Sequence, residues 1–436
     1  MKRMIISVIL MSMVLFGILA SCSDAVGGSG GNGRPEPPDK PGKQDSQEQS
    51  SEPTIGEATD LKDSNGNTIY SGSAAVSFSG KTKTISAAYL IDGVTVNITE
   101  GEFESASGSS DQVVFLVING GKLNITGTSS SPVVITKSGS AASGGQVGDD
   151  YSFYGINSAI VVAGSSSSAT ISNAQINTSS NGSNAVVSAV NANVSISDST
   201  ITTTGNAGSR GFHATYGGKI TADNVTISTS GKSCAALATD RGGGTVTASN
   251  MTLSTASAGS PLIYSTGTIT VTDSTGNASG AQMVVVEGGS SAIITGCDFT
   301  CSGNGNRNGT SSSNGASHTV DAAGIFIYQS MSGDSSLGTD YFTATDSTFT
   351  VTGSGVPMFF LTNITANITL SGTNVFNFDG GYLILAEATS AWGNGSSGAD
   401  VTLTSESVLS GNTVYRDTNS TLNINGSAVS SGEQVI

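Results

Sequence analysis

Apolar and polar residues alternate in short segments over most of this chain, and the alternation repeats. In the segment 218–229, GKITADNVTIST, every second side chain is apolar before and after a central polar pair. The same arrangement returns in the segments 169–179, 193–204 and 244–255. Alternation with a period of two among β-branched residues predicts strands that bury one face. A unit of this kind, repeated along a chain, predicts a solenoid built of strands.

The last apolar residue of each repeat marks the length of the unit. These residues are Ile176, Ile201, Ile227 and Leu253, which follow one another at intervals of 25, 26 and 26. A second apolar segment follows in each repeat, so a unit contains two or three strands. The pattern predicts an all-β fold, a single right-handed parallel β-helix of about 14 coils of roughly 25 residues, because parallel crossovers are right-handed. We expect equivalent residues of successive coils to stack inside it.

A turn residue lies three positions before each of these apolar residues and before the equivalent position of the later repeats. The series consists mostly of Asn, Asp and Gly: Asn173, Asp198, Asn224, Asn250, Asp273, Gly296, Asp346, Gly372, Ser405 and Gly426. Asn, Asp and Gly tolerate the left-handed backbone conformation, so we expect a ladder of turns along one edge of the β-helix. Calcium binding by the aspartates is a weaker alternative, because asparagines separate them. We therefore expect no metal site and no cofactor, with Ca²⁺ as the open alternative.

The N-terminus has the features of an export signal. Lys2 and Arg3 precede an apolar run at 4–19. A basic start followed by a short apolar run predicts a secretory signal peptide, here residues 1–21, and not a membrane-spanning helix.

The apolar run ends in the four residues LASC, the last of which is Cys22. This short sequence resembles the bacterial lipobox. The resemblance implies that Cys22 is lipidated and anchors the protein to a membrane of the bacterial envelope. Ser23, in the position after the cysteine, favours the outer membrane or cell surface by the same resemblance. Ordinary signal cleavage near Ala20 is the alternative.

Residues 22–60 form a segment rich in Gly, Pro and Ser. Such a composition buries little apolar surface and predicts a disordered tether, long enough to lift a domain away from a membrane. The expected organisation is therefore a signal peptide at 1–21, the lipidated cysteine and its tether at 22–60, and a β-helix domain at 61–436.

Charge restricts the partners. Asp and Glu number 32 against 16 Lys and Arg, for a net charge of −16. An acidic surface repels nucleic acid and anionic membranes. We expect contact with a membrane through the lipid on Cys22, a host, matrix or glycan ligand, no nucleic acid, and a monomer.

Three further cysteines, Cys234, Cys297 and Cys301, are expected to be small buried or turn residues. Their places in the repeat keep them farther apart than the limit of about 7 Å between the Cα atoms of a disulfide. Their spacing also does not match that of zinc ligands.

The repeat over 61–436 resembles the pectin-lyase-like superfamily of right-handed parallel β-helices, and it is most similar to adhesin-like surface lipoproteins of bacteria. The resemblance implies that enzymatic members carry an acidic cluster with Lys or Arg, or paired aspartates, in a groove. His213, Asp240 and Arg241 occupy similar places in two successive repeats, so they are the candidate acid–base residues. The alternative is that they are solvated turn residues.

Inserted loops supply the candidate ligand-binding residues. Trp392 lies in one insertion, and Asp149, Asp150, Tyr151 and Tyr154 lie in another. Sugar sites combine exposed aromatic rings with carboxylate or amide groups, so these residues are candidates for binding carbohydrate. The alternative is that each aromatic ring packs its own loop against the β-helix.

Two functions from different classes remain. The first is a lipid-anchored, adhesin-like or glycan-binding protein without catalysis, and the second is a polysaccharide lyase or glycoside hydrolase. A cluster of acidic and basic residues beside an aromatic ring in one groove would favour the enzyme, and a smooth Ser/Thr/Asn face would favour binding. Ice binding by the outward threonines Thr202, Thr226, Thr252 and Thr350 ranks third.

Overall fold

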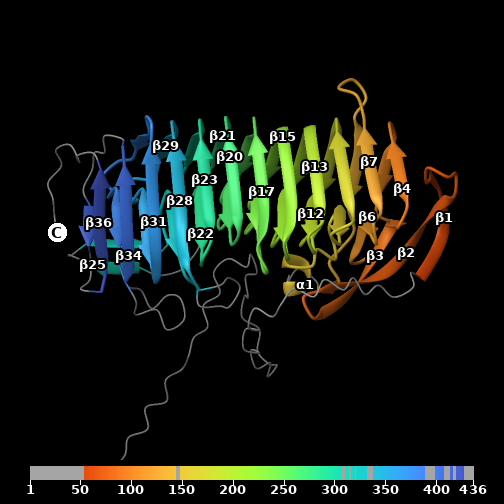
Figure 1. Cartoon of the computed structure of the whole chain (residues 1–436), viewed down its shortest axis with the longest axis horizontal. Helices are drawn as coiled ribbons and strands as arrows, with labels where there is room; N and C mark the ends of the chain where they lie inside the picture. The colour runs from red at the N-terminus through yellow and green to blue at the C-terminus, as the bar shows by residue number, and fades with distance from the viewer. Residues whose placement is uncertain are drawn as a thin grey trace, which may run out of the picture.

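The computed structural model describes residues 54–143, 148–305, 310–313, 316–319, 321–330, 337–387, 398–406, 413–415 and 419–426. These residues form a rod of stacked strands with one short helix, α1 (Asp149–Ser152), in a loop at its side (Figure 1). The strands pair from coil to coil in parallel, which confirms the parallel β-helix. Among the described residues, no helix is long and apolar enough to cross a membrane.

One side of every coil is a strand of the first sheet, here called sheet A. Its order along the rod is β1 (Thr54–Lys62), β2 (Thr68–Phe78), β3 (Lys81–Asp92), β6 (Gln112–Ile118), β9 (Ile160–Ala163), β12 (Val186–Ala189), β14 (Phe212–Thr215), β16 (Leu237–Thr239), β19 (Ile263–Ser265), β22 (Val284–Glu287), β27 (Ile325–Tyr328), β30 (Phe359–Thr362), β33 (Ile384–Ala386) and β35 (Thr413–Tyr415). The first three strands are antiparallel, and pairing is parallel from β3 onward. Strand β1 therefore joins the sheet from Thr54, ahead of the expected boundary at residue 61.

The other sides of the coils belong to sheet B, which consists of two ladders that meet at a bend. The first ladder is β4 (Thr95–Ile98), β7 (Lys122–Thr126), β10 (Ser168–Ser172), β13 (Asn193–Thr203), β15 (Gly218–Thr229), β17 (Gly244–Ser249), β20 (Thr268–Thr272), β23 (Ser291–Thr295), β28 (Thr339–Thr345), β31 (Ile364–Ser371), β34 (Ala399–Ser405) and β36 (Thr421–Gly426). The second is β5 (Glu102–Glu104), β8 (Val133–Lys137), β11 (Ala174–Thr178), the second halves of β13 and β15, β18 (Thr252–Thr255), β21 (Thr275–Ala278), β24 (Asp298–Cys301), β29 (Thr348–Val351) and β32 (Val375–Asn377). A separate hairpin joins β25 (Thr310–Ser313) to β26 (Ala316–Thr319). Twelve strands follow one another in the first ladder of the described residues, so the expected count of about 14 coils is not confirmed.

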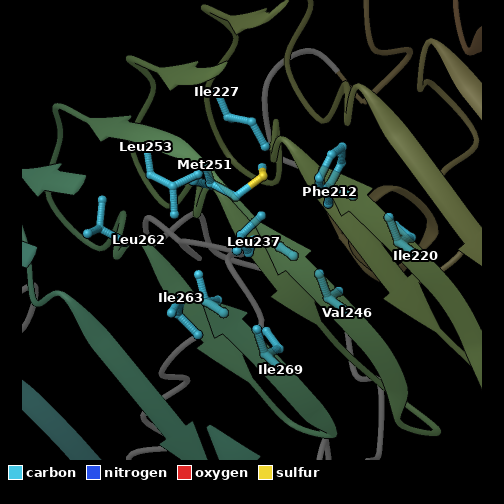
Figure 2. Packing of buried hydrophobic residues seen from close by; sticks show 14 of the residues in the cluster. Phe212, Ile220, Ile227, Leu237, Val246, Met251, Leu253, Leu262, Ile263 and Ile269 are labelled. Atoms are coloured by element: carbon cyan, nitrogen blue, oxygen red, sulfur yellow. The ribbon is translucent and has the colours of Figure 1, made fainter. Parts of the chain in front are cut away.

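The predicted stacking of the core is confirmed. Ile201 pairs in register with Ile227, which pairs in turn with Leu253, and all three side chains are buried. Figure 2 shows Ile227 and Leu253 within the apolar interior, between the strands of sheets A and B. The repeat length thus places chemically equivalent residues directly above one another.

The predicted ladder of left-handed turns is present at the bend of sheet B. The backbone angle φ lies between 47° and 64° at Asn173, Asp198, Asn224, Asn250, Asp273, Gly296, Asp346 and Gly372. Gly426 also has a positive φ, whereas Ser405 is not among the positive-φ residues. A side-chain hydrogen bond links two successive turns of this ladder, because Asn224 Nδ2 donates to Asp198 Oδ1 at 2.8 Å. Glycine follows aspartate at two rungs for a steric reason, since a Cβ at Gly372 would lie 2.2 Å from Asp346 Oδ1.

Two of the three buried cysteines, Cys234 and Cys297, occupy serine positions of internal ladders. The Cys297 thiol donates to the carbonyl two residues earlier, as the hydroxyls of Ser274 and Ser347 do. The Cys234 thiol donates to Gly205 O, and the hydroxyls of Ser209 and Ser260 donate to the equivalent carbonyls, each 29 residues earlier in the chain. Cys234, Cys297 and Cys301 are free thiols, as expected from their separation. Cys234 and Cys297 therefore act as substitutes for serine in the fold.

From β6 to β33, sheet A is buried on both faces. Its inner face joins the main core. The outer side chains of β6, β9 and β12 pack against residues of β2 and β3 and against Phe153 and Tyr154, in the loop that follows α1. Farther along, a second outer cluster contains Tyr264, Val285, Phe326, Phe360 and Leu385. The outer face of sheet B instead carries the exposed side chains, so the two sheets differ in what they offer to a ligand.

Candidate functional site

The candidate acid–base residues His213 and Asp240 do lie together. His213 is on β14, which pairs with β16, and Asp240 follows the end of β16. Nε2 of His213 is 3.8 Å from Oδ2 of Asp240. Both side chains are fully buried, so the alternative of solvated turn residues is wrong for this pair.

Arg210, which the sequence analysis did not single out, is the cation of this cluster. Its Nη2 is 2.9 Å from Asp240 Oδ2, and its Nη1 donates to Ser152 O at 3.0 Å. Nη1 also lies 3.4 Å from His213 Nε2. The guanidinium is fully buried. The sequence contained only a weak indication that Arg210 belongs with His213. It precedes His213 by three residues, in a segment without other charges.

The electrostatics of the cluster keep His213 neutral. Burial, and then the positive charge of Arg210, lower the pKa of His213 well below its usual value of 6.5. A neutral imidazole is a competent base, but a substrate must reach it. Solvent reaches none of the three side chains, so none of them is accessible to a substrate in this structure.

Arg241 lies apart from the cluster and clamps the loop that contains α1. Its Nη1 is 3.4 Å from Asp149 Oδ2, and its guanidinium lies 4.1 Å from the centre of the Phe153 ring. On the other side of the loop, Lys83 Nζ of β3 is 2.5 Å from Asp150 Oδ1. Both acidic candidates of this loop are thus engaged in ion pairs with the body of the protein.

The two tyrosines of the same loop are buried. Tyr151 is 5% exposed and Tyr154 is 2% exposed, which leaves no ring face for a sugar. The Tyr154 ring packs against Phe78 at 4.8 Å and stacks on Tyr216 at 5.8 Å between centroids. The alternative, in which these rings pack their own loop against the β-helix, is the arrangement observed. Trp392 and the lipidation candidate Cys22 lie outside the described residues.

A second buried acidic group lies at the junction of the sheets. Tyr264 and Tyr328 both donate their hydroxyls to Glu287 Oε2, the latter at 2.7 Å. Nearby, Asp340 Oδ1 accepts the backbone N–H of Ser290 at 2.9 Å, while its Oδ2 has no hydrogen-bond partner among the described residues. Burial is the main cause that raises the pKa of Asp340 to about 8, and Glu287 adds to it. The described residues contain no group of three or more His, Cys, Asp or Glu arranged to hold a metal ion.

The accessible surface with regular chemistry is the outer face of sheet B. One row, paired strand to strand, is Asn124, Thr170, Ser195, Thr221, Thr247, Thr270, Ile293, Thr343, Thr369 and Thr404. None of these side chains is buried. A parallel row contains Tyr341, which is 48% exposed. Sequence reasoning missed Tyr341, although alternation along β28 places it opposite the buried Phe342.

The threonines proposed for ice binding do not form a single row. Thr226 and Thr252 are register partners, but Thr202 pairs with Ser228 and Thr350 lies in the row of Thr202. The longest run in the row of Thr226 is Thr200, Thr226, Thr252 and Thr275, bounded by Gln175 and Asp298. The array is therefore short and interrupted.

Comparison with known proteins adds little. No family model matches the chain, and no curated protein matches it. Among solved structures, the chain is similar to the endo-xylogalacturonan hydrolase from Aspergillus tubingensis, at 12% identity, over 78% of this chain and 93% of that chain, with a TM-score of 0.27. A similarity of this size carries no argument about activity, and the assignment of a parallel β-helix rests on the strand pairing itself.

Proposed function

We propose that this protein is a lipid-anchored, non-catalytic, glycan-binding β-helix of the bacterial cell envelope. The observation that carries the proposal is the contrast between its surfaces. The outer face of sheet B carries rows of accessible hydroxyl and amide groups, interrupted by a few other residues such as Lys122, Lys219 and Ile293. By contrast, His213, Asp240 and Arg210 are fully buried. A smooth Ser/Thr/Asn face is the arrangement that favours binding over catalysis.

The chemistry of this face suits sugars. Thr and Ser hydroxyls and Asn amides each offer both donors and acceptors, which match the hydroxyls of a carbohydrate. Parallel pairing repeats these groups about every 4.8 Å along the rod, so a chain of sugars lying along it meets similar partners again and again. The net charge of −16 disfavours acidic polysaccharides.

The anchor and the tether complete the proposal. Lipid on Cys22 would hold the protein at the outer membrane or cell surface, and the segment 22–60 would lift the rod above it. From there, the face of sheet B would meet host, matrix or other extracellular glycans.

The enzymatic alternative needs an acid and a base within reach of substrate. The described acid–base candidates do not meet this condition, since His213, Asp240 and Asp340 are buried. Release of reducing ends or of unsaturated products from any polysaccharide would reverse this preference and support a lyase or hydrolase.

A glycan array tests the proposal directly. The probe is the chain from Ser23 to Ile436, which keeps β1 whole and lacks only the lipidated cysteine and the signal peptide. We expect binding to a subset of glycans without turnover. Absence of binding across polysaccharide and host-glycan panels would overturn the proposal.

A further inference from the structure

Tyr341 stands out on the face of sheet B. It is the only tyrosine of the described first ladder that is exposed on this face, and its neighbours Asp340 and Phe342 are buried on the opposite side of β28. The Tyr341 side chain is 48% exposed, so part of its ring is accessible to a ligand. Exposed aromatic rings among polar groups are typical of sites that bind sugars by stacking.

The neighbours of Tyr341 on this face are hydrogen-bonding groups, apart from Ile293, which pairs with Thr343. Along the rod, it pairs in register with Ser291 on β23 and Asn367 on β31, and Asn367 pairs with Thr402 on β34. Thr343 lies two residues along the same strand, and Thr369 lies beside it on β31. We call Tyr341, Ser291, Thr343, Asn367, Thr369 and Thr402 the Tyr341 patch.

Charge identifies the class of ligand. The outward residues of β23, β28 and β31 are all uncharged, and the only charged outward residue of β34 is Asp400, whose Oδ1 accepts the Thr421 hydroxyl at 2.7 Å. No cation is available on these four strands to bind a carboxylate or sulfate. The net charge of −16 further repels an acidic chain. The patch therefore fits an uncharged ligand.

We propose that the Tyr341 patch binds one segment of an uncharged, extended polysaccharide that lies along the rod, with one sugar ring stacked on Tyr341. This inference rests on the proposed function and adds the class of glycan and its central contact. Adjacent strands are about 4.8 Å apart, close to the length of one sugar in an extended chain, so Ser291 and Asn367 meet the sugars on either side of the stacked ring.

The same geometry argues against ice at this place. An ice-binding face must be flat, and the large, 48% exposed side chain of Tyr341 interrupts the smaller Ser and Asn side chains paired beside it. An exposed ring flanked by an amide and a hydroxyl has the chemistry of a surface on which a sugar stacks.

Equilibrium binding of the full chain to immobilised polysaccharides tests the inference. The panel contains cellulose, xyloglucan and mannan as uncharged probes, and polygalacturonate and alginate as acidic probes. Tyr341→Thr removes the ring and leaves a residue common in the neighbouring rows, whereas Tyr341→Phe keeps the ring. Tyr70→Thr is the matched control, because Tyr70 is 39% exposed on β2, at the opposite end of the rod (Figure 1).

We expect the wild type to bind at least one uncharged probe. Tyr341→Thr should weaken that binding on the order of tenfold, while Tyr341→Phe and Tyr70→Thr stay within about twofold of the wild type. Thermal unfolding of each variant confirms that the fold is intact, as expected for an exposed position.

Every other result of the binding experiment would overturn a specific part of the inference. Equal binding by wild type and Tyr341→Thr would remove Tyr341 from the site while leaving glycan binding in place. A loss in Tyr341→Phe as large as in Tyr341→Thr would show that the hydroxyl, not the ring, makes the contact. Binding to the acidic probes alone would refute an uncharged ligand, and no binding to any probe would overturn the proposed function as well.

Discussion

Ile227 offers the sharpest test of how the coils hold one another together. Its side chain is fully buried between Ile201 and Leu253 of the neighbouring coils. The space around it is tight, since a Cβ on Gly211 would lie 2.5 Å from Ile227 Cγ2. We expect Ile227→Asp to destabilise the β-helix on both sides of its coil, because stability in a solenoid is carried by interfaces between neighbouring repeats.

The magnitude follows from two costs. Removing a buried isoleucine side chain costs about 2–5 kcal/mol in transfer and cavity terms. Burying a carboxylate without a partner adds several kcal/mol, or forces it to take up a proton. The sum exceeds about 5 kcal/mol, which is comparable to the whole stability of many domains.

Thr226→Asp is the matched control. Thr226 precedes Ile227 on β15 and points outward, where it is exposed. The same carboxylate placed there stays in water and should change the free energy of unfolding by less than about 0.5 kcal/mol.

Limited proteolysis and urea unfolding of both variants provide the assay. We expect rapid cleavage within the coils next to residue 227 in Ile227→Asp, and cleavage at the wild-type rate in Thr226→Asp. Equal resistance of the two variants would refute the reasoning, since it would mean that a charge is tolerated equally on either face of β15.

Three further predictions concern the anchor, a buried acid and a buried thiol. Cys22→Ala should abolish labelling with a radioactive fatty acid and partitioning into detergent, and retention of both would refute lipidation at Cys22. Burial raises the pKa of Asp340 to about 8 from 3.8, so the folded state keeps a proton that the unfolded chain loses, and the contribution of Asp340 to the free energy of unfolding falls as pH rises from about 4 to about 8. Asp340→Asn should flatten this pH dependence in urea titrations, and an unchanged slope would contradict the assignment. Cys234→Ser should change the free energy of unfolding by less than about 1 kcal/mol, because serine occupies the equivalent positions 209 and 260. Cys234→Val, which cannot donate a hydrogen bond, should cost about 1–3 kcal/mol. Equal costs for the two variants in chemical unfolding would contradict the assignment of Cys234 to a serine position.

The sequence by itself determined the architecture of the coils. Ile201, Ile227 and Leu253 share one position of a repeat, and period-two alternation assigns each strand residue to one face. The turn ladder was equally visible, because a left-handed backbone accepts few residue types and Asn224 and Asp273 are among them. Both signals are local or strictly periodic, so no knowledge of long-range contacts was needed to find them.

The outer face of sheet A was only partly visible in the sequence. Its strands are continuous apolar runs, such as Val113–Val117 of β6, and such runs are typical of strands buried on both sides. What covers that face depends on where a loop docks, and the alternation of residues does not contain this information. The burial of Tyr154 against Phe78 and Tyr216 is set by such docking.

Only the tertiary structure decided which charged residues meet. The repeat placed His213 and Asp240 on adjacent coils, and they do approach each other. It did not show that Arg210, and not Arg241, completes the group, because that choice depends on the direction of each side chain and on the carbonyl of Ser152, far away in the sequence. In a solenoid, the repeat determines where a residue lies along the rod and which side of its strand it is on. Inserted loops and long side chains do not follow the repeat. The accessibility of a site therefore depends on how these loops and side chains pack.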